Sequence, residues 1–169
     1  MREKQAEGGV SLFAYREEQL SPELQLLKGI PLFSSLKTRE LKILESILHE
    51  RTYVEDEVIF EEGDEGLGMY IVLEGKIRIS RKAMIGSKEV TRLGPGHFFG
   101  ELSLLDGGPR SATAVASESA RLFGFFRPEF LEILEKYDRI GAKISFQLAR
   151  LSAQRLRQSL DGTQVSSCL

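Results

Sequence analysis

A change in hydrophobic periodicity near residue 51 is the feature that most limits what this chain can fold into. Before it, apolar residues recur at helical spacing, and after it short segments alternate between apolar and polar residues. Val58 and Phe60 alternate with acidic residues, and Ile77 and Ile79 alternate with basic and polar ones. Short alternating segments separated by frequent turn signals indicate an antiparallel sandwich or barrel.

Further strands and turns follow the same pattern. Met69–Leu73 is a nearly continuous apolar run, which is typical of a strand buried on both faces. We expect two more strands at Ala112–Ala116 and Leu122–Phe126. Glycines are expected at turns where a Cβ would be unfavourable, above all Gly63 and Gly75.

Helical signals lie on both sides of the strand region. Ser21-Pro22-Glu23 offers an N-cap, a first-turn proline and an acid. We expect a second helix from Thr38, with an apolar face of Leu41, Leu44, Ile47 and Leu48. Pro128 opens a helix expected to carry Phe130, Leu131, Leu134 and Tyr137. Asp138 is expected to cap a longer helix, whose apolar stripe is Ile140, Ile144, Leu148 and Leu151.

Residues 96–116 hold the motif that points to a function. A strand end at His97–Phe99 leads into a short apolar run, then a turn at Asp106–Pro109, then Arg110. Helix starts present unpaired N–H donors, and arginine offers a planar fork that binds phosphate through two hydrogen bonds. Glu101 lies nine positions before the arginine and can accept hydrogen bonds from sugar hydroxyls. The segment therefore suggests a ligand in which a phosphate is joined to a ribose.

This stretch resembles the phosphate-binding cassette of cyclic nucleotide-binding domains, as found in protein kinase A regulatory subunits and the catabolite activator protein. The match consists of Phe99-Gly100-Glu101-Leu102 and Pro109-Arg110-Ser111-Ala112-Thr113, in which residue identity, order and spacing agree. The resemblance covers about residues 22–160. It implies a mainly β fold: an eight-stranded antiparallel β-roll, similar to a jelly roll, with a helical lead-in, a short cassette helix and two C-terminal helices.

The resemblance assigns roles within the cassette. It implies that Arg110 holds the exocyclic oxygens of a cyclic phosphate and that Glu101 accepts the ribose 2′-hydroxyl. Gly100 lets the backbone approach the sugar, and backbone N–H groups around Ser111 and Ala112 complete the phosphate contacts. The structural alternatives are an ion pair for the arginine and an acid at a helix N-terminus for the glutamate.

The other predicted ligand residues are less specific. Phe99 and Leu102 lie within the motif itself. Ile79 and Val90 match family positions that pack against base and sugar, with plain core packing as the alternative. Arg155 is either a solvated cation at a helix end or a lid over the purine.

Base preference is inferred from Ser111. Family members that prefer cyclic GMP often carry threonine directly after the cassette arginine, so serine favours cyclic AMP, with cyclic GMP still possible. Gln154 and Gln158 compete with Arg155 for contact with the base.

Composition and motifs argue against an enzyme. The chain has two histidines, His49 and His97, whereas a metal enzyme of the cupin type needs about three plus an acid. We find no Ser-His-Asp, P-loop or Rossmann pattern in the sequence. We therefore expect neither catalysis nor a bound metal.

Bulk properties suggest a cytoplasmic protein. The net charge of −2 offers no basic footprint, so we expect no direct DNA binding. The single cysteine, Cys168, rules out an internal disulfide, and neither a signal peptide nor an apolar run of membrane-spanning length is present. We expect a flexible arm over residues 1–20, the binding domain over 21–160 and a disordered tail over 161–169.

The expected function is a regulatory sensor. It would bind cyclic AMP and move its C-terminal helix about a hinge near Phe126–Leu134. No DNA-reading motif follows and no kinase or channel segment precedes, so we expect an unknown protein effector, and Met1 favours a complete chain. The alternatives are a fragment of a longer regulated protein or transcription regulator, and an interaction scaffold that binds no ligand. We expect the stripe of the last helix to pack on the β-roll, with a homodimer seam as the alternative.

Overall fold

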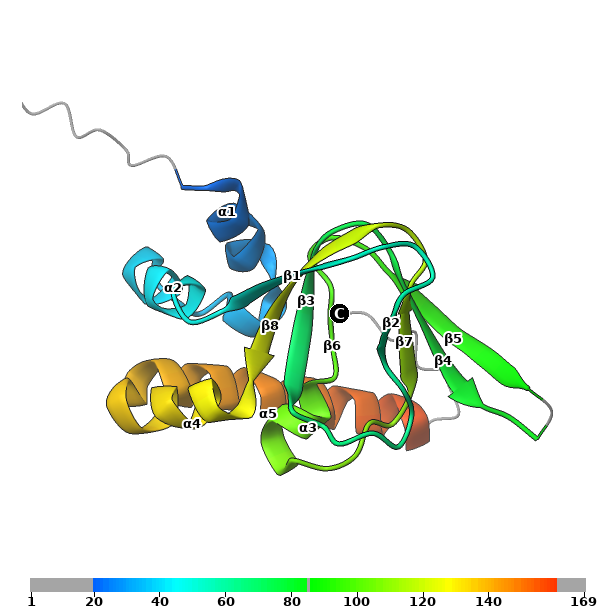
Figure 1. The fold of residues 1–169 in the computed structure, drawn as a ribbon. Coiled ribbons are helices and arrows are strands. Elements are labelled where there is room, and N and C mark those ends of the chain that lie inside the picture. The colour runs from blue at the N-terminus through cyan, green and yellow to red at the C-terminus, as the bar shows by residue number, and fades with distance from the viewer. Residues whose placement is uncertain (1–19, 85, 161–169) are drawn as a thin grey trace, which may run out of the picture.

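Two four-stranded antiparallel sheets form the body of the part of the chain that the structure describes (Figure 1). The computed structural model describes residues 20–84 and 86–160, so the expected arm up to residue 19 and the expected tail lie outside it. The first sheet contains, in spatial order, β1 (His49–Tyr53), β8 (Ala120–Phe126), β3 (Gly68–Glu74) and β6 (Phe98–Phe99). The second contains β2 (Val58–Phe60), β7 (Thr113–Ala116), β4 (Ile77–Lys82) and β5 (Ser87–Leu93). The prediction of an eight-stranded antiparallel β-roll is confirmed.

Helices precede and follow the strands along the chain, and one short helix lies between β6 and β7 (Figure 1). They are α1 (Pro22–Gly29), the 3₁₀-helix η1 (Pro31–Phe33), α2 (Thr38–Glu45), α3 (Glu101–Asp106), α4 (Arg127–Lys136) and α5 (Asp138–Leu160). Ser21 caps α1 as predicted, because its Oγ accepts a hydrogen bond from the N–H of Leu24 at 3.1 Å. The short cassette helix α3 and the C-terminal helices α4 and α5 also confirm the prediction, whereas η1 has no counterpart in it.

The helix expected to include Leu48 ends earlier. α2 ends at Glu45, and Ile47 and Leu48 follow in a turn and at the strand border. The hydroxyl of Ser46 donates a hydrogen bond to the Ile43 carbonyl at 2.7 Å, and such local bonds compete with regular helix hydrogen bonding. Both apolar side chains are still partly buried against the core, so their spacing reflects packing rather than helix.

The apolar residues expected on α4 do not all face the core, and Tyr137 follows the helix, which ends at Lys136. Of the four apolar residues assigned to this helix, Phe130 alone is buried. The exposed ones are Leu131 (43 %), Leu134 (37 %) and Tyr137 (42 %). Ile133, which the sequence analysis did not select, is buried instead. Because β8 leads directly into α4, the edge-on packing of Phe130 against Phe125, with ring centroids 5.8 Å apart, sets which face points inward.

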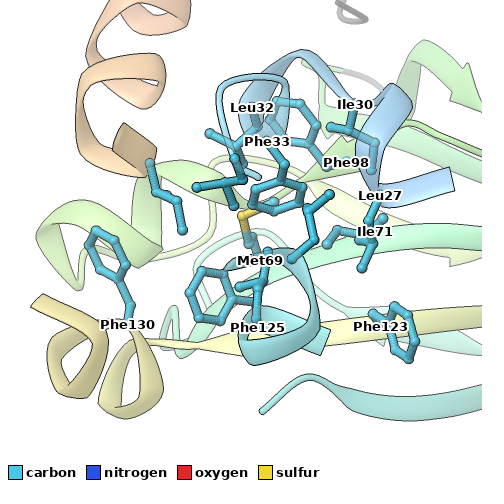
Figure 2. Packing of buried hydrophobic residues seen from close by; sticks show 14 of the residues in the cluster. Leu27, Ile30, Leu32, Phe33, Met69, Ile71, Phe98, Phe123, Phe125 and Phe130 are labelled. Carbon is cyan, nitrogen blue, oxygen red and sulfur yellow. The ribbon is translucent and has the colours of Figure 1, made fainter. Parts of the chain in front are cut away.

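The main hydrophobic core joins the helices to the first sheet (Figure 2). Phe33 of η1, Met69 of β3 and Phe125 of β8 belong to it and are fully buried. The stripe of α5 belongs to the same core and comprises Ile140, Ile144, Leu148 and Leu151. The stripe therefore packs inward, as expected, and is not available as a homodimer seam.

Strand β3 is buried on both faces, as predicted. Met69 and Ile71 belong to the main core. Val72 belongs to a second cluster, to which both sheets contribute, together with Ile77 and Leu122. β3 thus separates the two clusters and holds the sheets together.

Helix α5 reaches from the N-terminal helices to the cassette. Near its start, Nζ of Lys143 lies 2.6 Å from Oε2 of Glu40 in α2. Figure 1 shows α5 passing beneath the ends of the strands toward the second sheet. In its last turns, Arg155 forms an ion pair with Glu101 at the start of α3. The far end of α5 therefore lies beside the segment that carries the ligand motif.

Candidate ligand-binding site

A cavity of about 440 Å³ lies at the start of α3. Residues of β4, β5 and the cassette line it, and the last turns of α5 contribute two side chains. All ten residues that the sequence analysis selected are among the lining residues: Ile79, Val90, Phe99, Gly100, Glu101, Leu102, Arg110, Ser111, Ala112 and Arg155. The volume falls in the range of small-molecule sites. The fold thus brings together residues that are widely separated in the sequence.

Two glycines determine where α3 begins and ends. Gly100 precedes the helix and Gly107 follows it, with φ of +79° and +68°, a left-handed conformation that favours glycine. A Cβ at Gly100 would lie 2.5 Å from Nη1 of Arg110. Gly100 is therefore needed both for the turn into the helix and for the close approach of the guanidinium.

Arg127 holds the other end of α3. Its Nη1 donates hydrogen bonds to the carbonyls of Leu104 and Leu105 at 2.9 and 2.5 Å. Carbonyls in the last turn of a helix have no partner within the helix, and a cation there also interacts favourably with the helix dipole. The sequence analysis did not select Arg127. The contact ties the cassette helix to the start of α4.

Arg110 is a buried cation, with 5 % of its surface exposed. Its Nη1 donates hydrogen bonds to the carbonyls of Gly68 and Gly100, and its Cζ lies 4.1 Å from the ring centroid of Phe60. Its Nε has no hydrogen-bond partner among the described residues, and none of their carboxylates forms an ion pair with it. Burial lowers the pKa of the guanidinium. The structural alternative, an ion pair with a carboxylate of the described residues, is therefore wrong, and the guanidinium contacts carbonyl oxygens and an aromatic ring instead.

A glycine turn before β3 supports the cassette arginine. The N–H of Arg110 donates to the Asp64 carbonyl at 2.8 Å, and its carbonyl accepts from the N–H of Gly63 at 2.9 Å. Gly63 has the positive φ expected of it, +95°. A Cβ at Gly66 would lie 2.1 Å from Oγ of Ser103, so only glycine fits against the cassette helix there. The two backbone hydrogen bonds thus fix the position of Arg110 relative to the turn, and with it the point at which the guanidinium enters the cavity.

Glu101 and Arg155 form an ion pair across the cavity. The Glu101 side chain is 8 % exposed and its Oε1 accepts a hydrogen bond from Nη1 of Arg155, whose side chain is 29 % exposed. Cζ of Arg155 lies 5.9 Å from the ring centroid of Phe98. Arg155 is therefore not the solvated cation of the alternative interpretation. Gln154 and Gln158 are exposed and do not line the cavity.

Strands β4 and β5 form an apolar wall of the cavity. Ile79 of β4 is opposite Thr91 of β5, whereas its neighbour Ser80 is opposite Glu89. Val90 is therefore an extra residue between the two pairs, a bulge that turns the strand locally. Val90 is 44 % exposed at the cavity, so plain core packing does not describe it.

Some lining residues escaped the sequence analysis. They include Phe60, Arg81, Thr91, Ser103 and Leu156. The alternating pattern had placed Phe60 on a strand, but alternation does not reveal which strands meet at a cavity. Leu156 directly follows Arg155 in α5, so the interpretation of Arg155 as a lid could also have suggested Leu156.

The charged groups at the cavity favour an anionic ligand. They are Arg81, Glu101, Arg110 and Arg155. The described residues hold no group of three or more His, Cys, Asp and Glu side chains that could bind a metal ion. Within these same residues, no helix has both the length and the apolar character needed to cross a membrane.

The cavity thus combines an apolar wall, a carboxylate and a buried arginine that no carboxylate of the described residues neutralises. The family model of the cyclic nucleotide-binding domain matches residues 50–137, and the chain belongs to this family. The sequence resemblance is therefore confirmed.

Similar proteins include a cyclic AMP receptor protein and a regulator of transcription. The cyclic AMP receptor protein of Thermus thermophilus is 39% identical over 134 residues, which cover 79% of this chain and 60% of that protein. A CRP-like cAMP-activated global transcriptional regulator of Mycobacterium tuberculosis is 30% identical, covering 80% of this chain and 59% of the relative. The chain thus spans about three fifths of the length of these relatives.

Solved structures agree with the fold. The catabolite activator protein of Thermus thermophilus is similar with a TM-score of 0.71 and 38% identity, over 76% of this chain and 59% of that one. A cyclic nucleotide-binding domain from Methylobacillus flagellatus gives a TM-score of 0.73 at 28% identity, over 83% of this chain and 79% of that one. These similar proteins are regulatory or ligand-binding proteins.

Proposed function

We propose that this chain is a sensor module that binds a cyclic nucleotide, with cyclic AMP preferred, and that it is not an enzyme. The observation that carries the proposal is Arg110, a buried guanidinium that no carboxylate of the described residues neutralises. Leaving such a cation buried is costly unless a ligand supplies the anion. Serine at position 111 and the names of the two relatives above support cyclic AMP over cyclic GMP.

The cavity suggests how the nucleotide lies. We expect its phosphate to lie against Arg110 and the backbone N–H groups of Ser111 and Ala112. We expect its ribose hydroxyl to lie against Glu101. The base then lies toward Ile79 and the remaining apolar wall. Charge-assisted hydrogen bonds contribute about 1.5–3 kcal/mol each, so Arg110→Ala should weaken binding by about tenfold or more.

The Glu101–Arg155 pair offers a route from ligand to C-terminal helix. A ribose hydroxyl that binds Glu101 must share or replace the contact with Arg155, which belongs to α5. A ligand shifts a conformational equilibrium only when it binds two arrangements with different affinity, and this shared carboxylate provides such a difference. We expect hydrogen exchange of residues 138–160 to change when cyclic AMP binds, and identical exchange would refute the movement.

The effector is a further part of the proposal. We propose that a cytoplasmic protein receives the signal and that this module does not contact DNA itself, which its net charge of −2 supports. The relatives named as transcriptional regulators favour the alternative, in which the module controls a DNA-binding domain elsewhere. Gel-shift assays with this chain and with a longer product of the same coding region, where one exists, separate the two.

The outer face of α5 is proposed as a dimer seam, in place of the buried stripe. Its exposed apolar or small residues are Ala142, Phe146, Ala149, Ala153 and Leu160, together with Leu156, which lies at the edge of this face and also lines the cavity. Their spacing alternates between four and three, which is the repeat of a two-stranded coiled coil and suits a second copy of the same helix. Sedimentation velocity should show a dimer for the wild type and a monomer for Phe146→Glu. A monomeric wild type would refute the seam.

Calorimetry and thermal shift with cyclic AMP, cyclic GMP and linear AMP test the function. We expect heat and stabilisation with cyclic AMP, a weaker response to cyclic GMP and little response to linear AMP. Arg110→Ala should lose the response, whereas Arg92→Ala, at an exposed arginine paired with Glu89 and outside the cavity, should keep it. No response of the wild type at millimolar nucleotide would favour the interaction scaffold.

A further inference from the structure

One cation at the cavity is not part of the cassette motif. Arg81 lines the cavity from β4, about 30 positions before the cassette arginine. Side chains alternate along a strand, so Ile77, Ile79 and Arg81 share one face of β4. Ile77 is buried in the second core cluster and Ile79 lines the cavity. An arginine therefore stands where the apolar series would continue, and core packing does not account for it.

A single hydrogen bond connects Arg81 to the cassette. Its Nε donates to the carbonyl of Ser111 at 2.9 Å. Among the described residues, no carboxylate forms an ion pair with Arg81 and no acceptor binds its terminal Nη groups. A guanidinium has five N–H donors, and four of them are on the Nη atoms. Most of the donors of Arg81 are therefore free to bind an anion.

Positive side chains outnumber negative ones around the cavity. Arg155 pairs with Glu101, which leaves Arg81 and Arg110 without carboxylate partners among the described residues. Both flank Ser111, since Arg110 precedes it in the chain and Arg81 binds its carbonyl. Arg110 is buried, whereas Arg81 is exposed. An anion that reaches the Ser111 backbone thus meets one guanidinium inside the cavity and another at its opening.

We propose that Arg81 is a second phosphate-binding residue, which meets the nucleotide at the opening of the cavity and makes its affinity depend on ionic strength. This inference rests on the proposed function of the cavity as a cyclic nucleotide site. Because Arg81 is exposed, salt screens its attraction for phosphate, while the buried Arg110 is screened much less. An exposed charge-assisted contact should change the dissociation constant by about five- to tenfold at low salt.

Arg78 provides a matched control. It lies on the same strand, three residues earlier, on the face opposite to Arg81, and it does not line the cavity. Replacing either arginine with glutamine removes the same charge from the same strand. A difference between the two variants therefore reports the position of the charge and not the net charge of the protein.

The test is a titration of the full chain with cyclic AMP at about 50 and about 500 mM salt. Arg81→Gln should bind about five- to tenfold more weakly than wild type at low salt, and the difference should shrink at high salt. Arg78→Gln should bind as the wild type does at both salt concentrations. Arg81→Lys, which keeps the charge, should retain most of the salt dependence.

The outcomes separate this inference from the proposed function. If the wild type does not bind cyclic AMP, the function fails and the inference fails with it. If the wild type binds and Arg81→Gln binds equally well, the inference alone is refuted. It is also refuted if Arg81→Gln weakens binding equally at both salt concentrations, since the arginine would then act only by holding the Ser111 carbonyl.

Discussion

Removing Arg155 should destabilise the unliganded chain, because it leaves the carboxylate of Glu101 buried without its partner. The two side chains are 29 % and 8 % exposed. Breaking a fully buried ion pair costs about 3–5 kcal/mol, whereas an exposed pair contributes at most about 1 kcal/mol. With one partner buried and the other partly exposed, we expect Arg155→Ala to lower the free energy of unfolding by about 2 kcal/mol. In a chain of this size that corresponds to a Tm lower by about 4–8 °C.

A double-mutant cycle isolates this interaction. The free energy of unfolding is measured by urea denaturation for wild type, Arg155→Ala, Glu101→Gln and the double variant. We expect a coupling energy of about 1–2 kcal/mol, because the two groups are in direct contact. Arg150→Ala is the matched control on the same helix, since Arg150 is exposed and bonds to Gln147, and it should change stability by less than about 0.5 kcal/mol. Additive effects, within about 0.3 kcal/mol, would refute the argument.

Three further predictions concern the supports of the site. Gly66→Ala should destabilise the chain by about 2 kcal/mol in thermal unfolding, because its Cβ would lie 2.2 Å from a backbone oxygen, whereas Gly94→Ala, with nothing within 4 Å, should be nearly neutral. Arg127→Ala should weaken cyclic AMP binding in calorimetry by about tenfold, because the end of α3 loses the two hydrogen bonds from this side chain. Arg127 itself does not line the cavity, and unchanged affinity would contradict its role. The hydrogen bond from Lys143 holds the pKa of Glu40 below its ordinary value of 4.5, so this carboxylate stabilises the fold above pH 4.5 and the contribution is lost as the pH falls through the lowered pKa. Lys143→Met should therefore flatten the acid side of the stability profile measured by urea denaturation, and an unchanged profile would contradict the assignment.

The cassette and the strand pattern could be predicted because their signals are local. Gly100 and Gly107, which flank α3, have positive φ, a conformation that local steric contacts make unfavourable for other residues. Met69–Leu73 is buried on both faces, as its apolar run suggested. The identity, order and spacing of the cassette residues predict a site without any knowledge of the tertiary packing, and the fold brings these residues to one cavity. Local chemistry of this kind is conveyed directly by the sequence.

The features that sequence could not supply depend on packing between distant segments. Arg155 and Glu101 are 54 positions apart, and their pairing depends on the path of α5 under the sheets. Arg127 and Arg81 look like ordinary surface cations until their carbonyl partners are known. The inner face of α4 could not be predicted, because Ile133 and Leu134 are equally apolar and the junction with β8 decides which of them is buried.

A crystal structure of the chain with saturating cyclic AMP would show directly whether Arg110 and Glu101 hold the nucleotide. We expect a nucleotide in the cavity of about 440 Å³, with its phosphate oxygens against Arg110 and its ribose hydroxyl against Glu101. A cavity without nucleotide, or a nucleotide whose phosphate lies away from Arg110, would contradict this expectation.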